Sequence, residues 1–174
     1  MNILSIDIGT TTGWALATSD GKVRGGSVKT APTRMEGPGA RWLKFRAFLA
    51  ETQRSVDQIH VVYYERVLRH TAVQAAHVYG GFEAMLQVWC ESNRVRMVAV
   101  PVPVIKKSWT GKGNADKVAM VAMAKSRGFN PVDDNHADAL ALLAYALGIE
   151  WRAPRTDHSL MEPPAAPLFD EVTG

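Results

Sequence analysis

Apolar residues in the first thirty positions come in short runs that are separated by Gly, Thr, Ser and Asp. Short runs between turn-forming residues are typical of β-strands. The runs fall at residues 3–8, 14–17 and 23–28, with Gly-Thr-Thr-Thr-Gly at 9–13 and Ser-Asp-Gly at 19–21 between them. Because both breaks are short, the pattern predicts a three-stranded antiparallel meander.

Further along, helical periodicity alternates with two more apolar runs. The runs at residues 59–64 and 95–100 predict two buried strands. Helices are expected over residues 39–54, 72–92, 114–126 and 134–148, where apolar residues recur at helical spacing. The second helix contains Gly80 and Gly81, so it should bend there or pack closely against another backbone.

Helix and strand ends follow from individual residues. Pro101 and Pro103 should end the fifth strand, and residues 106–113 are then expected to form a polar, basic loop. Asp134 is the expected N-cap of the last helix, and Gly148 is its expected end.

The order of these elements predicts the class of fold. Parallel neighbours need a crossover connection, and the fourth and fifth strands are each reached through a helix. We expect an α/β protein with a mixed five-stranded sheet, an antiparallel meander plus parallel strands, flanked by helices. This body should span residues 1–150, and residues 151–174, with four prolines and no periodicity, should be a flexible tail.

Acidic residues stand at positions where a charge is costly unless it is paired. Asp7 lies inside an apolar strand, and Glu65 ends the fourth strand, which in this topology lies beside the first. Asp138 borders the apolar stripe of the last helix, and Asp134 lies one turn earlier on the same face. Acids that converge from two strands and a helix supply the oxygen ligands that hard divalent cations prefer.

This set predicts a two-metal phosphodiester hydrolase with Asp7, Glu65, Asp134 and Asp138 as catalytic and metal-binding residues. In such a site one ion lowers the pKa of the attacking water and the other stabilises the leaving 3′ oxygen. Cys90 and four of the histidines have no spacing typical of a metal site or a triad, and we interpret them as structural: His60, His70, His77 and His158. His136 differs because it lies between two of the acids.

Basic residues accompany the acids along the chain. The candidates for DNA binding are Arg66 and Arg69, which follow Glu65, and Lys106, Lys107, Lys112 and Lys117, which lie within twelve residues containing one acid. Lysines beside a carboxylate site favour contacts with backbone phosphates. A solvated lysine face is the alternative interpretation.

Composition narrows the choice of compartment and partner. The chain has one Cys and no apolar run near the roughly 18 residues that a membrane span needs, so we expect a cytoplasmic protein with no membrane contact. Residues 1–150 carry 18 basic and 13 acidic residues, a net charge of +5 that weakly favours a polyanionic partner.

The segments SIDIGTTTGWAL, VVYYERV, TGKGNADK and NHADALALLAYAL, in this order and spacing, resemble a RuvC-type Holliday-junction resolvase of phage type, in the RNase H-like superfamily. The resemblance covers about residues 1–149. It implies an RNase H-like fold, a homodimer with two active sites, dependence on Mg²⁺ or Mn²⁺ with two ions per site, and paired nicking of four-way or otherwise branched DNA. A phage-encoded member would work in the cytoplasm of its bacterial host.

Carried over residue by residue, the resemblance places three of the family's acids on Asp7, Glu65 and Asp138. The family has an acid or a His three residues before its last Asp, and that position is Asn135 here. Asp134, favoured by its i, i+4 spacing, or His136 would then be the fourth ligand, unless the site works with three carboxylates. Two of the lysines, Lys107 and Lys112, match the family's basic loop approximately.

Two other functions stay open. A resolvase-like module would bind branched DNA without cutting it, although unused buried acids would then lower its stability. The segment DIGTTTG also resembles the first phosphate loop of actin-like ATPases and sugar kinases. Those proteins need two such domains, which 174 residues hardly accommodate.

Two segments are candidates for assembly. The helix over residues 72–92, rich in Ala, Gly and Met, is a candidate homodimer surface, with burial in the core as the alternative. In the tail, Pro-Leu-Phe-Asp at 167–170 faintly resembles a sliding-clamp docking peptide but lacks the usual Gln. An unstructured end without a partner is the alternative there.

Overall fold

Five strands pair into one mixed sheet. The computed structural model describes residues 1–68 and 72–151. The strands are β1 (Ile3–Asp7), β2 (Thr11–Ala17), β3 (Val23–Lys29), β4 (Val61–Arg66) and β5 (Arg96–Pro101), in the spatial order β3-β2-β1-β4-β5. The first three form the expected antiparallel meander, and β4 runs parallel to both β1 and β5. The predicted division at residue 150 stays a prediction, since residues 152–174 lie outside the described part.

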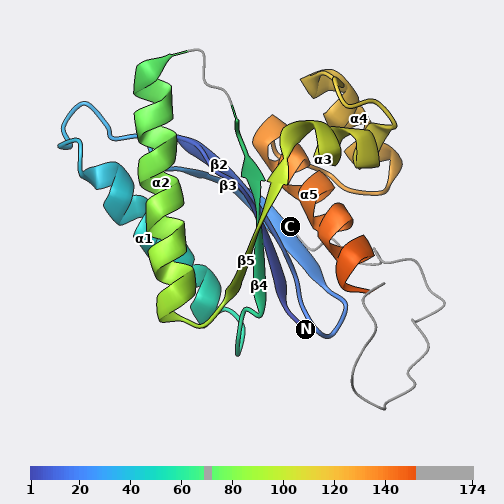
Figure 1. Ribbon diagram of the computed structural model, residues 1–174, viewed down its shortest axis with the longest axis horizontal. Coiled ribbons are helices and arrows are strands. Elements are labelled where there is room, and N and C mark those ends of the chain that lie inside the picture. Colours follow the sequence, from blue (N-terminus) through green and yellow to red (C-terminus); the bar gives the residue numbers. More distant parts are fainter. Residues whose placement is uncertain (69–71, 152–174) are drawn as a thin grey trace.

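Helices cover both faces of the sheet (Figure 1). One face carries α1 (Ala40–Arg54) and α2 (Val73–Ser92), and the other carries α3 (Val102–Thr110), α4 (Lys117–Ser126) and α5 (Asp134–Glu150). Because successive strand residues point to opposite faces, Leu4 and Ile6 pack with α1 and α2, whereas Ile3 packs with α5. No helix in the described ranges combines the length and apolar character that crossing a membrane requires.

The predicted loop over residues 106–113 is wrong in its first half, because α3 occupies residues up to Thr110. Pro103 lies in the first turn of this helix. A proline is tolerated there, since the N–H that it lacks would have no partner within the helix. Ile105 and Trp109, one turn apart, are both buried, and the helix ends at Thr110, followed by its C-cap Gly111 with φ 82°. Pro101 therefore both ends β5 and precedes a helix.

The start of α5 also differs from the expectation. Asp133, and not Asp134, is the N-cap: its Oδ1 accepts the His136 N–H at 2.8 Å and the Ser27 hydroxyl at 2.5 Å. The helix continues to Glu150, past the predicted end at Gly148. Asp134 therefore does not cap the helix and lies in its first turn.

Two glycines of the meander let α5 approach the sheet. A Cβ on Gly13 in β2 would lie 1.9 Å from the carbonyl oxygen of Asn135, and one on Gly25 in β3 would lie 2.4 Å from Nε2 of His136. Atoms cannot approach so closely, so a side chain at either position would displace the first turn of α5.

The glycine pair in α2 behaves differently at its two positions. A Cβ on Gly81 would lie 2.5 Å from the Trp42 ring of α1, whereas Gly80 has nothing within 4 Å. The expected close packing therefore occurs at Gly81, against a side chain of α1 and not against a backbone.

Candidate active site

The two strand acids lie next to each other at the edge of the sheet where the carboxyl ends of the inner strands β1 and β4 meet. Ile6 of β1 is in register with Tyr64 of β4, and the next residue of each parallel strand is an acid, Asp7 or Glu65. Both point to the face that α5 covers, because Ile3 and Tyr63, which share their alternation, pack in that core.

Helix α5 brings the third acid to the same place. The Ser5 hydroxyl of β1 donates to the carbonyl of Ala139 at 2.8 Å, and Asp138 directly precedes Ala139. Asp7, Glu65 and Asp138 are thus gathered from two strands and a helix, as the sequence predicts. They are far apart in the sequence, and the parallel pairing of β1 with β4 and the packing of α5 unite them.

These carboxylates influence one another electrostatically. Burial, followed by the charges of Glu65, Asp138 and Asp134, raises the pKa of Asp7 well above its usual value. Burial and then Asp138 raise the pKa of Glu65 to about 7, and burial raises the pKa of Asp138 to about 6. Like charges in a poorly hydrated site disfavour ionisation, so a cation among them would be strongly attracted.

The donor chemistry fits a hard divalent cation. Within the described part of the chain, Oδ1 of Asp138 is a buried oxygen that has no hydrogen-bond partner. A buried carboxylate oxygen without a donor is costly, and a metal ion would satisfy it. In the described residues no group of three or more His, Cys, Asp or Glu side chains already has a geometry that holds an ion. The three carboxylates therefore offer suitable donor atoms without forming a ready-made ligand set within the described part of the chain.

The fourth acid is engaged elsewhere. Asp134 pairs with the Nζ of Lys117, and this contact holds the pKa of Asp134 below its usual value. Its charge still contributes to the raised pKa values of Asp7 and Asp138, so it lies near the cluster. Because 76% of the Lys117 side chain is exposed, the pair is weak and easily exchanged.

The other two candidates for fourth ligand are used in packing. His136 is buried, its Nδ1 accepts the Val132 N–H at 3.2 Å, and its ring lies against Gly25 of β3. Burial lowers the pKa of His136, which keeps the ring neutral in this contact. The backbone of Asn135 packs on Gly13. Among the three candidates, Asp134 is the one whose charge is felt in the cluster.

Two lysines lie close enough to the acids to affect them. Lys106 is partly buried on α3, and its Nζ donates to the carbonyl of Ala115 at 2.6 Å. Its charge lowers the pKa of Glu65 and of Asp138, and Lys117 has the same effect on Asp7 and Asp138. Both cations therefore stand at the margin of the cluster.

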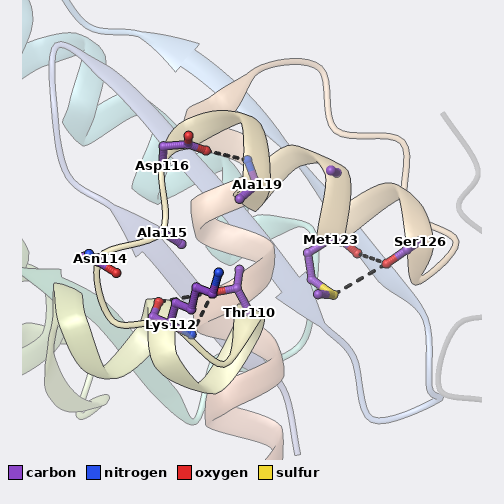
Figure 2. Close-up of a pocket in the computed structure, with 9 residues that line it drawn as sticks. Thr110, Lys112, Asn114, Ala115, Asp116, Ala119, Met123 and Ser126 are labelled. Atoms are coloured by element: carbon purple, nitrogen blue, oxygen red, sulfur yellow. Dashed lines mark hydrogen bonds between the residues drawn. The ribbon is translucent and has the colours of Figure 1, made fainter.

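The remaining basic candidates are more peripheral. Arg66 is exposed at the end of β4, Lys107 is exposed on α3, and Arg69 lies outside the described residues. Lys112 occupies the turn between α3 and α4, where its N–H donates to the Thr110 hydroxyl at 3.2 Å. It lines an open pocket of about 670 Å³, shown in Figure 2, whose lining includes none of the four predicted acids.

Comparison with solved structures identifies the architecture. Thermus thermophilus RuvC in complex with Holliday junction substrate matches with a TM-score of 0.72 and 23% identity, over 87% of this chain and 96% of that chain. The fold is that of RuvC. A second T. thermophilus RuvC structure matches over the same shares with a TM-score of 0.70 and 23% identity. The predicted RNase H-like sheet is therefore confirmed.

A more distant match extends the comparison. The yeast mitochondrial Holliday junction resolvase Ydc2 matches the RuvC-like fold with a TM-score of 0.58 and 13% identity, over 80% of this chain and 75% of that chain. A scan of protein-family models and a search of curated sequences found no match.

Sequence reasoning did not identify two residues whose hydroxyls bond to the backbone beside the acids. Ser5 lies two residues before Asp7 on the same face and anchors α5, and its place inside an apolar run was a usable signal. Tyr79 of α2 contacts the backbone around Glu65, and its position in a helix gives no signal in the sequence.

Proposed function

We propose that this protein is a divalent-metal-dependent endonuclease that resolves Holliday junctions and other branched DNA by paired phosphodiester hydrolysis. The observation that carries the proposal is the convergence of Asp7, Glu65 and Asp138 on one face of a RuvC-like fold. One of the solved structures compared above is T. thermophilus RuvC in complex with Holliday junction substrate, which supports the choice of DNA.

Asp7, Glu65 and Asp138 would hold Mg²⁺ or Mn²⁺, and Asp134 would complete the set for two ions after exchanging its contact with Lys117. Bound divalent ions would activate the attacking water and stabilise the leaving 3′ oxygen. The orphaned Oδ1 of Asp138 and the mutually raised pKa values of the carboxylates support this assignment.

The protein's own cations would bind and orient the substrate. Lys106 and Lys117 stand beside the acids and would hold the phosphate that is cut. The exposed basic side chains would contact the backbone phosphates on either side: Arg66, Arg69, Lys107 and Lys112. Such contacts position DNA without reading its sequence.

The decisive experiment compares a labelled four-way junction, a flap and a linear duplex with Mg²⁺ or Mn²⁺, and maps each cut strand. We expect paired nicks in the junction, and we expect Asp7→Asn, Glu65→Gln and Asp138→Asn to reduce cleavage at least a hundredfold while retaining junction binding. Asp57→Asn, an exposed acid outside the cluster, is the matched control.

The outcomes separate the proposal from its alternatives. A junction that shifts in mobility with every strand intact would identify a non-catalytic binding module. Parental cleavage by Glu65→Gln would show that the metal ligands are wrongly assigned. ATP binding in calorimetry without nuclease activity would favour the kinase-like alternative.

Paired cutting of a four-way junction needs two active sites, so we propose a homodimer. α2 buries Phe82, Leu86 and Cys90 against the sheet, and its outer side exposes Val73 and Val88. We place the dimer contact on that outer side, and sedimentation of the parent and of Val88→Glu tests it, with a monomeric variant expected. A single Cys is compatible with work in the cytoplasm, of a bacterial host if the protein is phage-type.

The proposed clamp contact through residues 167–170 falls outside the described residues. Removal of residues 155–174 should weaken co-purification with a sliding clamp if the contact exists, and unchanged recovery would exclude it.

A further inference from the structure

The hydroxyl of Tyr79 bridges the backbone on both sides of Arg66. It donates to the carbonyl of Glu65 at 2.9 Å and accepts the N–H of Val67 at 3.3 Å. Tyr79 belongs to α2, on the opposite face of the sheet from α5, and its ring packs in the core beneath β4. One side chain therefore connects α2 to the end of the strand that carries Glu65.

This pair of hydrogen bonds replaces a missing part of the sheet. In a parallel ladder, the residue opposite Arg66 would donate to the carbonyl of Glu65 and accept from the N–H of Val67. Alternate residues of β4 direct their backbone groups to opposite neighbours. The carbonyl of His60 accepts the N–H of Arg96 in β5, so the Glu65 carbonyl and the Val67 N–H face β1 instead. In the register that pairs Ile6 with Tyr64, the β1 residue opposite Arg66 would be Ile8, but β1 ends at Asp7. The sheet backbone supplies no donor at this level, and the Tyr79 hydroxyl provides one.

We propose that Tyr79 is a positioning residue that holds Glu65 in place for divalent-metal binding. The Glu65 carboxylate is repelled by Asp138, and it also shares its edge of the sheet with Asp7. If the backbone groups around Glu65 had no hydrogen-bond partners, this repulsion would displace the end of β4. The hydrogen bonds to the Tyr79 hydroxyl fix that end and keep the carboxylate directed toward α5. The inference rests on the proposed function, because it concerns the same acids.

The same helix offers a matched control. The Tyr64 hydroxyl donates to Oε1 of Glu83 in α2 at 2.6 Å, so it also joins β4 to α2. Tyr64 directly precedes Glu65, but its side chain bonds to another side chain and not to the backbone around Glu65. Tyr64→Phe and Tyr79→Phe each remove one tyrosine hydroxyl from the same interface.

The experiment measures Mn²⁺ binding to the full chain by calorimetry and hydrogen exchange at the Val67 amide. We expect Tyr79→Phe to weaken Mn²⁺ binding about 5- to 10-fold, as loss of one hydrogen bond predicts, and to remove protection of Val67. Junction cleavage by Tyr79→Phe should recover as Mn²⁺ is raised. Tyr64→Phe should keep the parental Mn²⁺ affinity and Val67 protection even where it lowers thermal stability.

Each result supports or overturns the inference. Parental Mn²⁺ affinity in Tyr79→Phe, or equal weakening in Tyr64→Phe, would show that Tyr79 has a structural role alone. A parent chain that binds no Mn²⁺ and cuts no junction would overturn the proposed function and this inference together. Binding in the parent with no change in Tyr79→Phe would overturn the inference alone.

Discussion

At the scale of the residue, the acids that suit the site for a metal ion are a burden on the metal-free fold. The pKa of Glu65 is raised from 4.5 to about 7, mainly by burial and then by Asp138. Between pH 4.5 and about pH 7, the folded chain therefore retains a proton on Glu65 that the unfolded chain has already released. Where the unfolded state binds fewer protons, stability falls as pH rises.

Metal-free protein should accordingly lose stability between about pH 4.5 and pH 7 through Glu65. Glu65→Gln removes this ionisation, so at pH 8 it should raise the free energy of unfolding by about 1 to 3 kcal/mol and at pH 4 leave it nearly unchanged. Urea unfolding in EDTA at the two pH values measures the difference. Glu51→Gln, at an exposed position of α1, is the control. An equal effect at both pH values would contradict the assigned burial of this charge.

The residue types in the cluster were predictable, while their partners were not. Asp7 and Glu65 stand out because a charge in an apolar strand is costly, and that signal is local. The capping role of Asp133 depends on Ser27, which lies far away in the sequence and donates to it at 2.5 Å. Asp134 was predicted as the cap because local spacing alone cannot choose between adjacent aspartates.

At the scale of the element, α5 and β2 must lie close together for Asp138 to reach the strand acids. The approach depends on Gly13, whose missing side chain makes room for the Asn135 carbonyl. Gly13 is the register partner of Asp7 in β1, so the contact lies at the level of the site.

Gly13→Ala should displace the first turn of α5 and with it Asp138. We expect a loss of about 3 kcal/mol in the free energy of unfolding, as overpacking against a rigid backbone predicts, together with weaker Mn²⁺ binding. Gly80→Ala is the matched control, because nothing lies within 4 Å of its Cβ, and a helical Ala should stabilise the chain by about 1 kcal/mol. Urea unfolding and Mn²⁺ calorimetry of both variants test this, and parental values in Gly13→Ala would refute it.

The prediction of elements failed at residues 106–110, because proline is compatible both with the end of a strand and with the start of a helix. Pro101 and Pro103 end a strand in one context and begin a helix in another. The choice was made by Ile105 and Trp109, whose burial against the sheet favours a helix at α3. That burial is a property of the tertiary structure, so the local sequence alone predicts a basic loop there.

At the scale of the whole molecule, charge is arranged around the site. The acids occupy the edge where β1 and β4 end, and the cations of α3 and α4 stand along its margin. The opposite edge of the sheet carries the turn between β2 and β3, because Ala17 lies opposite Ile3 at the start of β1. DNA held by the cations should thus approach from the acid edge.

Phosphate contacts release counterions, so binding to a four-way junction in EDTA should weaken linearly in log–log form as salt is raised. Lys107 is exposed on α3 beside the partly buried Lys106, and Lys107→Ala should lower the magnitude of this slope by about 1 while leaving the fold intact. Lys22→Ala, in the turn at the opposite edge, removes the same charge and should leave the slope unchanged. Fluorescence anisotropy at four salt concentrations measures both slopes. Both variants lower the net charge equally. An equal reduction of the slope in both would therefore mean that overall charge attracts DNA, whereas a reduction in Lys107→Ala alone would support binding at the acid edge.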